Sequence, residues 1–131
     1  MKVIVDTSIW SLAFRRKKLA NDENENRLKK LILESNVILI GPIRQEILSG
    51  IKDKKQFERL KNNLKTFSDF SITQNDYETA AEFFNLCRTN GIQGSNTDFL
   101  ICAIACNNNF LIFTSDKDFD NYKEYLPINF Y

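Results

Sequence analysis

VIVDTS, residues 3–8, begins with three β-branched residues that are followed directly by the acid Asp6. Residues 37–40 (VILI) and 110–113 (FLIF) form two more nearly continuous runs of β-branched, leucine and aromatic residues. Such runs are typical of strands that are covered on both faces, as in a parallel sheet. The three runs therefore predict the centre of a parallel sheet.

Segments with helical periodicity separate the predicted strands. Strands that alternate with helices imply right-handed crossovers and a three-layer α/β sandwich. Short apolar patterns at residues 70–72 and 128–130 bring the predicted central parallel sheet to four or five strands. The spacing of apolar residues predicts helices over residues 27–34, 42–51, 56–67, 77–88 and 98–106.

Length, charge and cysteine content narrow the class of protein. A chain of 131 residues with 43% hydrophobic content can bury one core, so we expect a single domain over residues 1–131. The 18 basic and 17 acidic residues nearly cancel, so net charge neither supports nor excludes a nucleic-acid partner. Without a long apolar segment, the protein is expected to be cytoplasmic, with Cys87, Cys102 and Cys106 as free thiols.

Acids follow the predicted strands at the point where each strand ends. Asp6 follows the first strand without a gap, and Asp116 comes three residues after Phe113. Because ligands bind beyond the carboxyl ends of the strands in an open parallel sheet, we expect these two carboxylates to share a crevice. Asp98 at the head of one helix, and Glu46 beside the apolar stripe of another, can reach the same crevice.

Each of these acids also has a purely structural interpretation. Asp6 and Asp116 could cap the helices that follow them. Asp98 has the capping-box spacing from Ser95, and Glu46 could be a solvated helix residue. If the acids form a cluster, a purely structural role becomes less favourable for them. Like charges about 4 Å apart repel by on the order of 4 kcal/mol at an effective dielectric of about 20. Clustered carboxylates therefore need a cation or raised pKa values.

The ligand atoms that the chain offers determine which cation it could bind and which reaction that cation could support. Carboxylate oxygens are hard ligands that favour magnesium or manganese. The sequence has no histidine, which removes the usual zinc ligand and an imidazole general base. Water activated by a divalent cation is then the nucleophile that remains, and its chemistry is phosphodiester hydrolysis.

Four segments match the motifs of one nuclease family in order and spacing. They are VDTSIW (residues 5–10), RQEILSG (44–50), NTDFLICA (96–103) and TSDKDF (114–119). On these segments the chain resembles PIN-domain ribonucleases, particularly the VapC-like toxins of type II toxin–antitoxin systems, over nearly its whole length. The resemblance implies a magnesium- or manganese-dependent endoribonuclease that forms a homodimer and binds a cognate antitoxin.

The resemblance also assigns roles to particular side chains. Asp118 would be an outer, auxiliary acid. Ser8 and Thr114 would supply hydroxyl groups that orient the carboxylates. The catalytic, metal-binding quartet that the resemblance implies is Asp6, Glu46, Asp98 and Asp116.

Two basic runs could bind RNA phosphates beside the crevice. One follows the first short helix, and the other follows the helix that carries Glu46. Lysine and arginine neutralise the phosphate backbone in most nucleic-acid complexes. The alternative is a solvated surface, as for most runs of charge. The candidate RNA-binding residues are Arg15, Arg16, Lys17, Lys52, Lys54 and Lys55.

Three other functions stay open on the sequence. The chain could be a housekeeping PIN nuclease for RNA processing, or a non-catalytic PIN-like interaction module whose acids bind a cation or cap helices. It could also form an aspartyl phosphate on Asp6. The last fits poorly, because the D-x-D-x-T pattern of haloacid dehalogenases would need an aspartate in place of Ser8.

Overall fold

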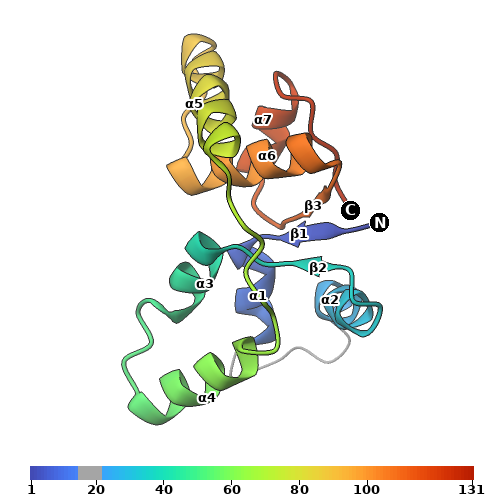
Figure 1. The fold of residues 1–131 in the computed structure, drawn as a ribbon, viewed down its shortest axis with the longest axis vertical. Coiled ribbons are helices and arrows are strands. Elements are labelled where there is room, and N and C mark those ends of the chain that lie inside the picture. The colour runs from blue at the N-terminus through green and yellow to red at the C-terminus, as the bar shows by residue number, and fades with distance from the viewer. Residues whose placement is uncertain (15–21) are drawn as a thin grey trace.

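A parallel sheet lies at the centre of the computed structural model, which describes residues 1–14 and 22–131 (Figure 1). Its strands β1 (Val3–Val5), β2 (Val37–Ile38) and β3 (Leu111–Phe113) run in the order β2-β1-β3. Val3 is paired with residues of both neighbouring strands, so β1 is central. Every residue of β1 is buried, which explains its unbroken apolar sequence.

The fourth and fifth predicted strands are reduced to single parallel bridges at the two edges of the sheet. Leu39 bridges Asp69 at one edge, and Ile112 bridges Phe130 at the other. The chain after Asp69 soon caps the next helix with Thr73, which leaves little length for a strand. The expected sheet of four to five strands therefore has three regular strands within the described ranges.

Seven helices of the described residues cover the sheet in two layers. Figure 1 shows α1–α4 on one side of the strands and α5–α7 on the other, which is the three-layer sandwich that the sequence predicts. The chain moves one way across the sheet from β1 to β2 and the other way from β2 to β3, so right-handed crossovers place helices on both faces. The helices are α1 (Thr7–Ala13), α2 (Glu23–Leu33), α3 (Gly41–Leu48), α4 (Lys54–Leu64), α5 (Gln74–Thr89), α6 (Asn96–Asn108) and α7 (Asp118–Lys123).

Capping residues set the starts of two helices earlier than apolar spacing predicts. Thr73 and Asp76 form a complete capping box, so α5 begins three residues before Tyr77. The side chain of Asp22 accepts a hydrogen bond from the backbone N–H of Glu25 and begins α2. Residues 23–26, which precede the helix predicted over residues 27–34, are therefore also helical.

The core joins both helix layers to the sheet. Residues 99–105 of α6 are all buried, and α6 contacts β1 and β3. The three cysteines are free thiols as predicted, with Cys87 and Cys102 buried and Cys106 half-buried. In the part of the chain that the structure describes, no helix has the length and apolarity needed to cross a membrane.

Candidate active site

Asp6 is a buried carboxylate held by two hydroxyl groups. Its side chain follows β1 directly, and the residue is only 7% exposed. Oδ2 accepts hydrogen bonds from Ser8 Oγ at 2.7 Å and from Thr114 Oγ1 at 2.8 Å. Asp6 occupies the N-cap position of α1, but its side chain makes no capping hydrogen bond. The capping interpretation is therefore wrong for Asp6, and Oδ1 accepts no hydrogen bond from the described residues.

The loop after β3 is tied to the loop after β1. Ser8 Oγ accepts a hydrogen bond from the backbone N–H of Ser115 at 3.1 Å, and Thr114 Oγ1 accepts one from that of Asp116 at 3.0 Å. Asp116 Oδ1 in turn accepts from the N–H of Asp118, the first residue of α7, at 2.9 Å. The capping interpretation thus holds in part for Asp116. The same bonds bring Asp116 and Asp118 to the carboxyl end of β1.

Asp98 lies half-buried in the first turn of α6. Its N–H donates to Ser95 Oγ at 3.1 Å, but its carboxylate does not complete the capping box. Oδ2 instead accepts a hydrogen bond from the hydroxyl of Tyr122 at 2.7 Å. Burial raises the pKa of Asp98, and the charges of Asp6 and Asp116 raise it further, while the bonds from Tyr122 and Ser95 lower it.

Glu46 approaches the same acids from α3. Its Oε1 accepts a long hydrogen bond from Thr7 Oγ1 at 3.4 Å, and its side chain is otherwise exposed. Partial burial raises the pKa of Glu46, and the charges of Asp6 and Asp98 raise it as well. Glu46 is therefore more exposed than Asp6, which is buried.

The four acids act on one another electrostatically, and their oxygens are the donor type that magnesium and manganese prefer. Within residues 1–14 and 22–131, no three acidic or cysteine side chains converge tightly enough to form a ready-made metal cluster. Magnesium keeps several waters and is usually bound through one or two carboxylates, so it does not require such a cluster. The residues present fit a hydrated divalent cation.

Tyr122 is a site residue that the sequence does not indicate. It lies on the buried face of α7 with Phe119, where an aromatic residue is expected to be core. Burial strongly raises the pKa of Tyr122, and its bond to Asp98 raises it further. The phenol therefore remains protonated at neutral pH and can donate to the carboxylate. The contact joins residues 24 positions apart, so local sequence spacing carries no signal of it.

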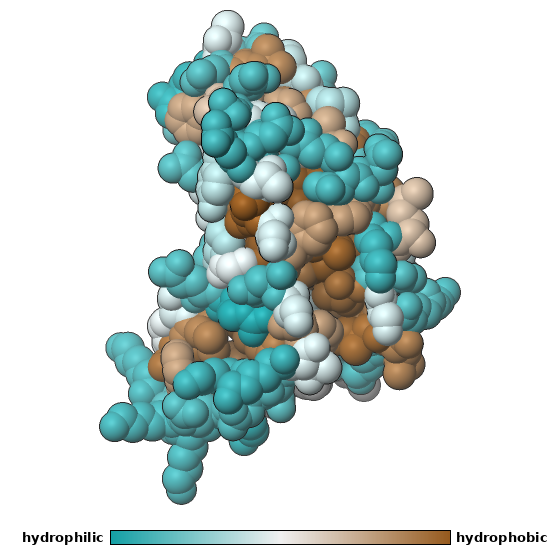
Figure 2. All heavy atoms as spheres, in the orientation of Figure 1, coloured by the Kyte–Doolittle hydropathy of each residue, from teal (hydrophilic) through white to brown (hydrophobic). Residues whose placement is uncertain are grey.

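The candidate RNA-binding residues are only partly described. Lys52, Lys54 and Lys55 are exposed around the start of α4. This end of α4 lies apart from the carboxyl ends of the strands (Figure 1), and hydrophilic atoms cover the corresponding lower-left part of Figure 2. The other run, residues 15–17 with Arg15, Arg16 and Lys17, lies outside the described residues.

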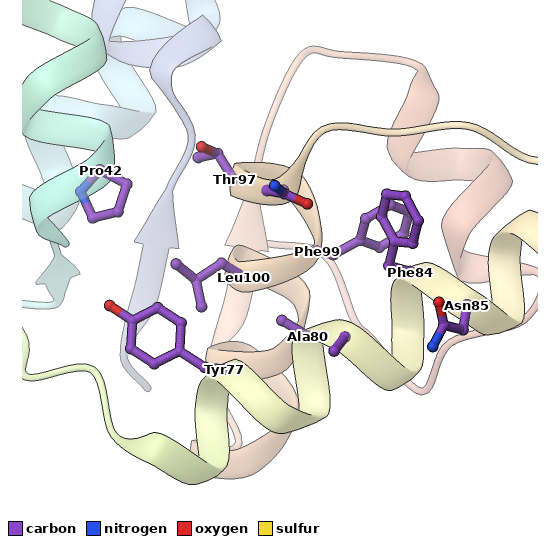
Figure 3. A pocket seen from close by; sticks show the side chains of 10 residues that line it. Pro42, Tyr77, Ala80, Phe84, Asn85, Thr97, Phe99 and Leu100 are labelled. Carbon is purple, nitrogen blue, oxygen red and sulfur yellow. The ribbon is translucent and has the colours of Figure 1, made fainter.

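A mostly apolar cavity of about 470 Å³ lies between α5, α6 and the start of α3. Pro42 of α3 lies across from Leu100 of α6, and Tyr77 of α5 borders the opening between them (Figure 3). Thr97, the neighbour of Asp98 in the chain, also lines the cavity. None of the four acids lines this cavity.

A model of the PIN domain family matches residues 3–125, which is nearly the whole chain. The chain belongs to the PIN-domain family. The match includes all four candidate acids of this PIN domain, together with Ser8, Thr114 and Tyr122. No curated protein matched the sequence of this PIN domain significantly.

Several solved structures share the fold of this PIN domain. FitAcB from Neisseria gonorrhoeae is 19% identical, with a TM-score of 0.79 over 98% of this chain and 96% of that one. VapBC2 from Rickettsia felis, bound to a DNA fragment from its promoter, is 19% identical, with a TM-score of 0.75 over 100% of this chain and 98% of that one. A toxin–antitoxin complex from Klebsiella pneumoniae is 20% identical, with a TM-score of 0.62 over 88% of each chain. At these identities the likeness shows the fold alone.

Proposed function

We propose that this PIN domain is a magnesium- or manganese-dependent endoribonuclease and the toxin of a toxin–antitoxin pair. PIN domains are generally nucleases. The observation that carries the proposal is the environment of Asp6, a buried carboxylate whose Oδ2 is held by two hydroxyls. Its charge raises the pKa values of Glu46 and Asp98, so negative charge is concentrated where a cation would offset it.

The proposed mechanism assigns a task to each side chain of the crevice. When bound, a divalent cation supplies the Lewis acidity that activates water and polarises the RNA phosphate. Ser8 and Thr114 hold Asp6 in one orientation, so its free oxygen is positioned before the cation arrives. Asp118, whose N–H bonds to Asp116, would add negative charge at the rim. The residues proposed to hold the cation are Asp6, Glu46, Asp98 and Asp116.

RNA is the proposed substrate. The exposed Lys52, Lys54 and Lys55 could neutralise phosphates of an RNA chain that extends beyond the crevice. The start of α4, next to which these lysines lie, is apart from the carboxyl ends of the strands (Figure 1), which favours contacts with flanking nucleotides rather than with the cleaved phosphate. A contact by Arg15, Arg16 or Lys17 stays a prediction from the sequence.

The proposed partners are a cognate antitoxin and a second copy of this PIN domain. The fold is similar to that of a chain in the toxin–antitoxin complex from Klebsiella pneumoniae, which supports the first. The family resemblance in the sequence supports the second. Light scattering of the purified protein, alone and mixed with the product of any small gene that lies next to its own, would measure both associations. A monomeric mass at micromolar concentration would contradict the homodimer.

The nuclease proposal is tested by cleavage of a broad RNA pool by the purified protein with magnesium or manganese. We expect cleavage that a chelator abolishes and that Asp98→Asn reduces by at least about 100-fold, because the variant removes a charge from the cation site. The matched control is Asp120→Asn, which makes the same change at an exposed acid of α7. Its cleavage rate should equal that of the wild type.

The outcomes separate the candidate functions. Equal cleavage by the wild type and Asp98→Asn, with circular dichroism showing both folded, would overturn the proposed site. No cleavage by the wild type with either metal would favour the non-catalytic interaction module. Cleavage that persists in the presence of the neighbouring gene product would favour a housekeeping nuclease over a toxin.

A further inference from the structure

Tyr122 is placed to control the orientation of Asp98. Its hydroxyl donates a hydrogen bond of 2.7 Å to Asp98 Oδ2, and its side chain has no exposed surface. The donor lies on α7 and the acceptor on α6, so the bond joins two elements of the same layer. Asp98 Oδ1 accepts no hydrogen bond from the described residues, and this oxygen remains available to a ligand.

The phenol ring of Tyr122 is fixed by its neighbours. The ring centroid lies 5.0 Å from that of Phe99 and 5.1 Å from that of Phe119. Contacts of this geometry hold aromatic rings in place within a core. Phe99 follows Asp98 directly in α6, so the same turn of helix supplies both the acid and part of the support for its donor.

Gly94 closes the third side of the ring. A Cβ atom at this position would lie 2.8 Å from Tyr122 Cζ and 2.9 Å from Phe99 Cε2, closer than real side chains approach. It would also meet the hydroxyl oxygen of Tyr122. The backbone φ of Gly94 is not in the left-handed region, so glycine is needed here for space rather than for its conformation. The loop before α6 therefore allows the phenol to reach Asp98.

A neutral donor suits this position chemically. A lysine or arginine beside Asp98 would compete with a divalent cation for the carboxylate, because it would neutralise the same charge. A phenol binds one carboxylate oxygen and leaves the negative charge in place. Hydrogen bonds of this kind orient metal-binding carboxylates in proteins.

We infer that Tyr122 is a positioning residue, whose hydroxyl holds Asp98 Oδ2 so that Oδ1 is presented to a divalent cation. The inference rests on the proposed function, in that it takes Asp98 as a cation ligand. It adds a residue that lies outside the acidic quartet and its hydroxyl partners. It also gives Gly94 a role, since any side chain there would displace the phenol.

The test compares Tyr122→Phe with the wild type in binding of manganese, followed by calorimetry and by the electron paramagnetic resonance spectrum of the bound ion. Phenylalanine keeps the ring and its packing and removes only the hydroxyl. We expect manganese affinity to fall by roughly 10- to 100-fold, as for other partners of metal ligands. Tyr125→Phe is the matched control, because Tyr125 is 40% exposed and its hydroxyl makes no bond within the described residues.

A double-mutant cycle separates positioning from general support of the fold. If Tyr122 acts through Asp98, Tyr122→Phe should have no further effect on manganese affinity in an Asp98→Ala background. A loss of the same size in both backgrounds would overturn the inference, as would wild-type affinity in Tyr122→Phe. Gly94→Ala offers a second variant, and it should lower manganese affinity without altering either partner.

The result does not depend on RNA cleavage. Manganese binding that is weakened by Tyr122→Phe, in a protein that cleaves no RNA, would support the positioning role and contradict the nuclease proposal. RNA cleavage by the wild type, with unchanged manganese affinity in Tyr122→Phe, would support the nuclease proposal and contradict the positioning role. Absence of manganese binding by the wild type would overturn the positioning role, because Asp98 would then have no cation to receive.

Discussion

Asp98 occupies a position where a carboxylate is costly. It is half-buried, and Asp6 and Asp116 place like charges near it, so its pKa is raised. A raised pKa means that the folded protein binds the proton of Asp98 more tightly than the unfolded chain does. This contribution to the free energy of unfolding is fully favourable at low pH. It decreases as the pH rises from about 3.8, the ordinary value, through the raised pKa.

Asp98→Asn should therefore raise the free energy of unfolding of the metal-free protein at neutral pH relative to that of the wild type. The gain should shrink as the pH falls from the raised pKa towards the ordinary value, and vanish below that value, where the wild-type carboxyl is protonated in both states. Urea unfolding in the presence of a chelator, at neutral pH and near pH 4, measures it. A difference between the two proteins that stays constant with pH would contradict the prediction. The trade of stability for a functional charge is common at active sites.

Among the elements, α3 carries both Glu46 and Arg44, and the Arg44 side chain anchors this helix to neighbouring segments. Arg44 Nε donates to Asp69 Oδ1 at 2.9 Å, and Nη1 donates to the carbonyl oxygen of Leu64 at 3.0 Å. Nη2 donates to the carbonyl oxygen of Phe67. One guanidinium thus ties α3 to the end of α4 and to the segment that bridges Leu39. The bonds satisfy backbone carbonyls at a helix end, which otherwise need water or a cap.

Arg44→Ala should lower the free energy of unfolding by about 2 kcal/mol, because it leaves three acceptors without their charged donor. Arg44→Lys should restore little of this, since an ammonium cannot reproduce the planar fork of a guanidinium. Chemical denaturation measures both variants. Arg59→Ala, at an exposed position of α4, is the control and should change stability by less than about 0.5 kcal/mol. Equal losses at the two arginines would show that the tie is unimportant.

At the scale of the whole molecule, the acids come from four separate stretches of chain that meet at one end of the sheet. The order β2-β1-β3 puts β1, which Asp6 follows, between the strand that precedes Glu46 and the strand that precedes Asp116. The unfolded chain cannot bring these carboxylates together. A cation that binds them therefore binds the folded state selectively and must stabilise it.

Magnesium or manganese should raise the melting temperature of the wild type in a concentration-dependent way. The stabilisation should approach about 2.7 kcal/mol at a metal concentration 100-fold above the dissociation constant. Differential scanning calorimetry with and without a chelator measures the shift. Asp6→Asn should abolish most of this shift. Asp53→Asn, at an exposed acid that caps the start of α4, should keep it, because the asparagine oxygen can still accept the capping hydrogen bond. An equal shift in all three proteins would indicate non-specific binding of the ion.

Apolar runs that alternate with helical patterns were sufficient to predict the three-layer sandwich. A buried parallel strand must be apolar along its whole length, so β1 and β3 are visible in the sequence. The helix ends predicted from apolar spacing were less accurate than the strands. Capping by Thr73 and Asp22 extended α5 and α2, because a hydrogen bond to a few terminal N–H groups outweighs the absence of an apolar stripe there.

The fold class follows from short segments of the sequence, because the burial of a strand along its whole length leaves a local apolar run. How the candidate acids are held depends on contacts that form only in the folded chain. Thr114 bonds Asp6 across 108 positions, and Tyr122 bonds Asp98 across 24, so neither contact leaves a local pattern. The space that Gly94 gives to Tyr122 likewise exists only once α6 and α7 have packed. Short-range periodicity reports which face of a segment is buried, whereas the partner of a buried polar group depends on how distant segments meet.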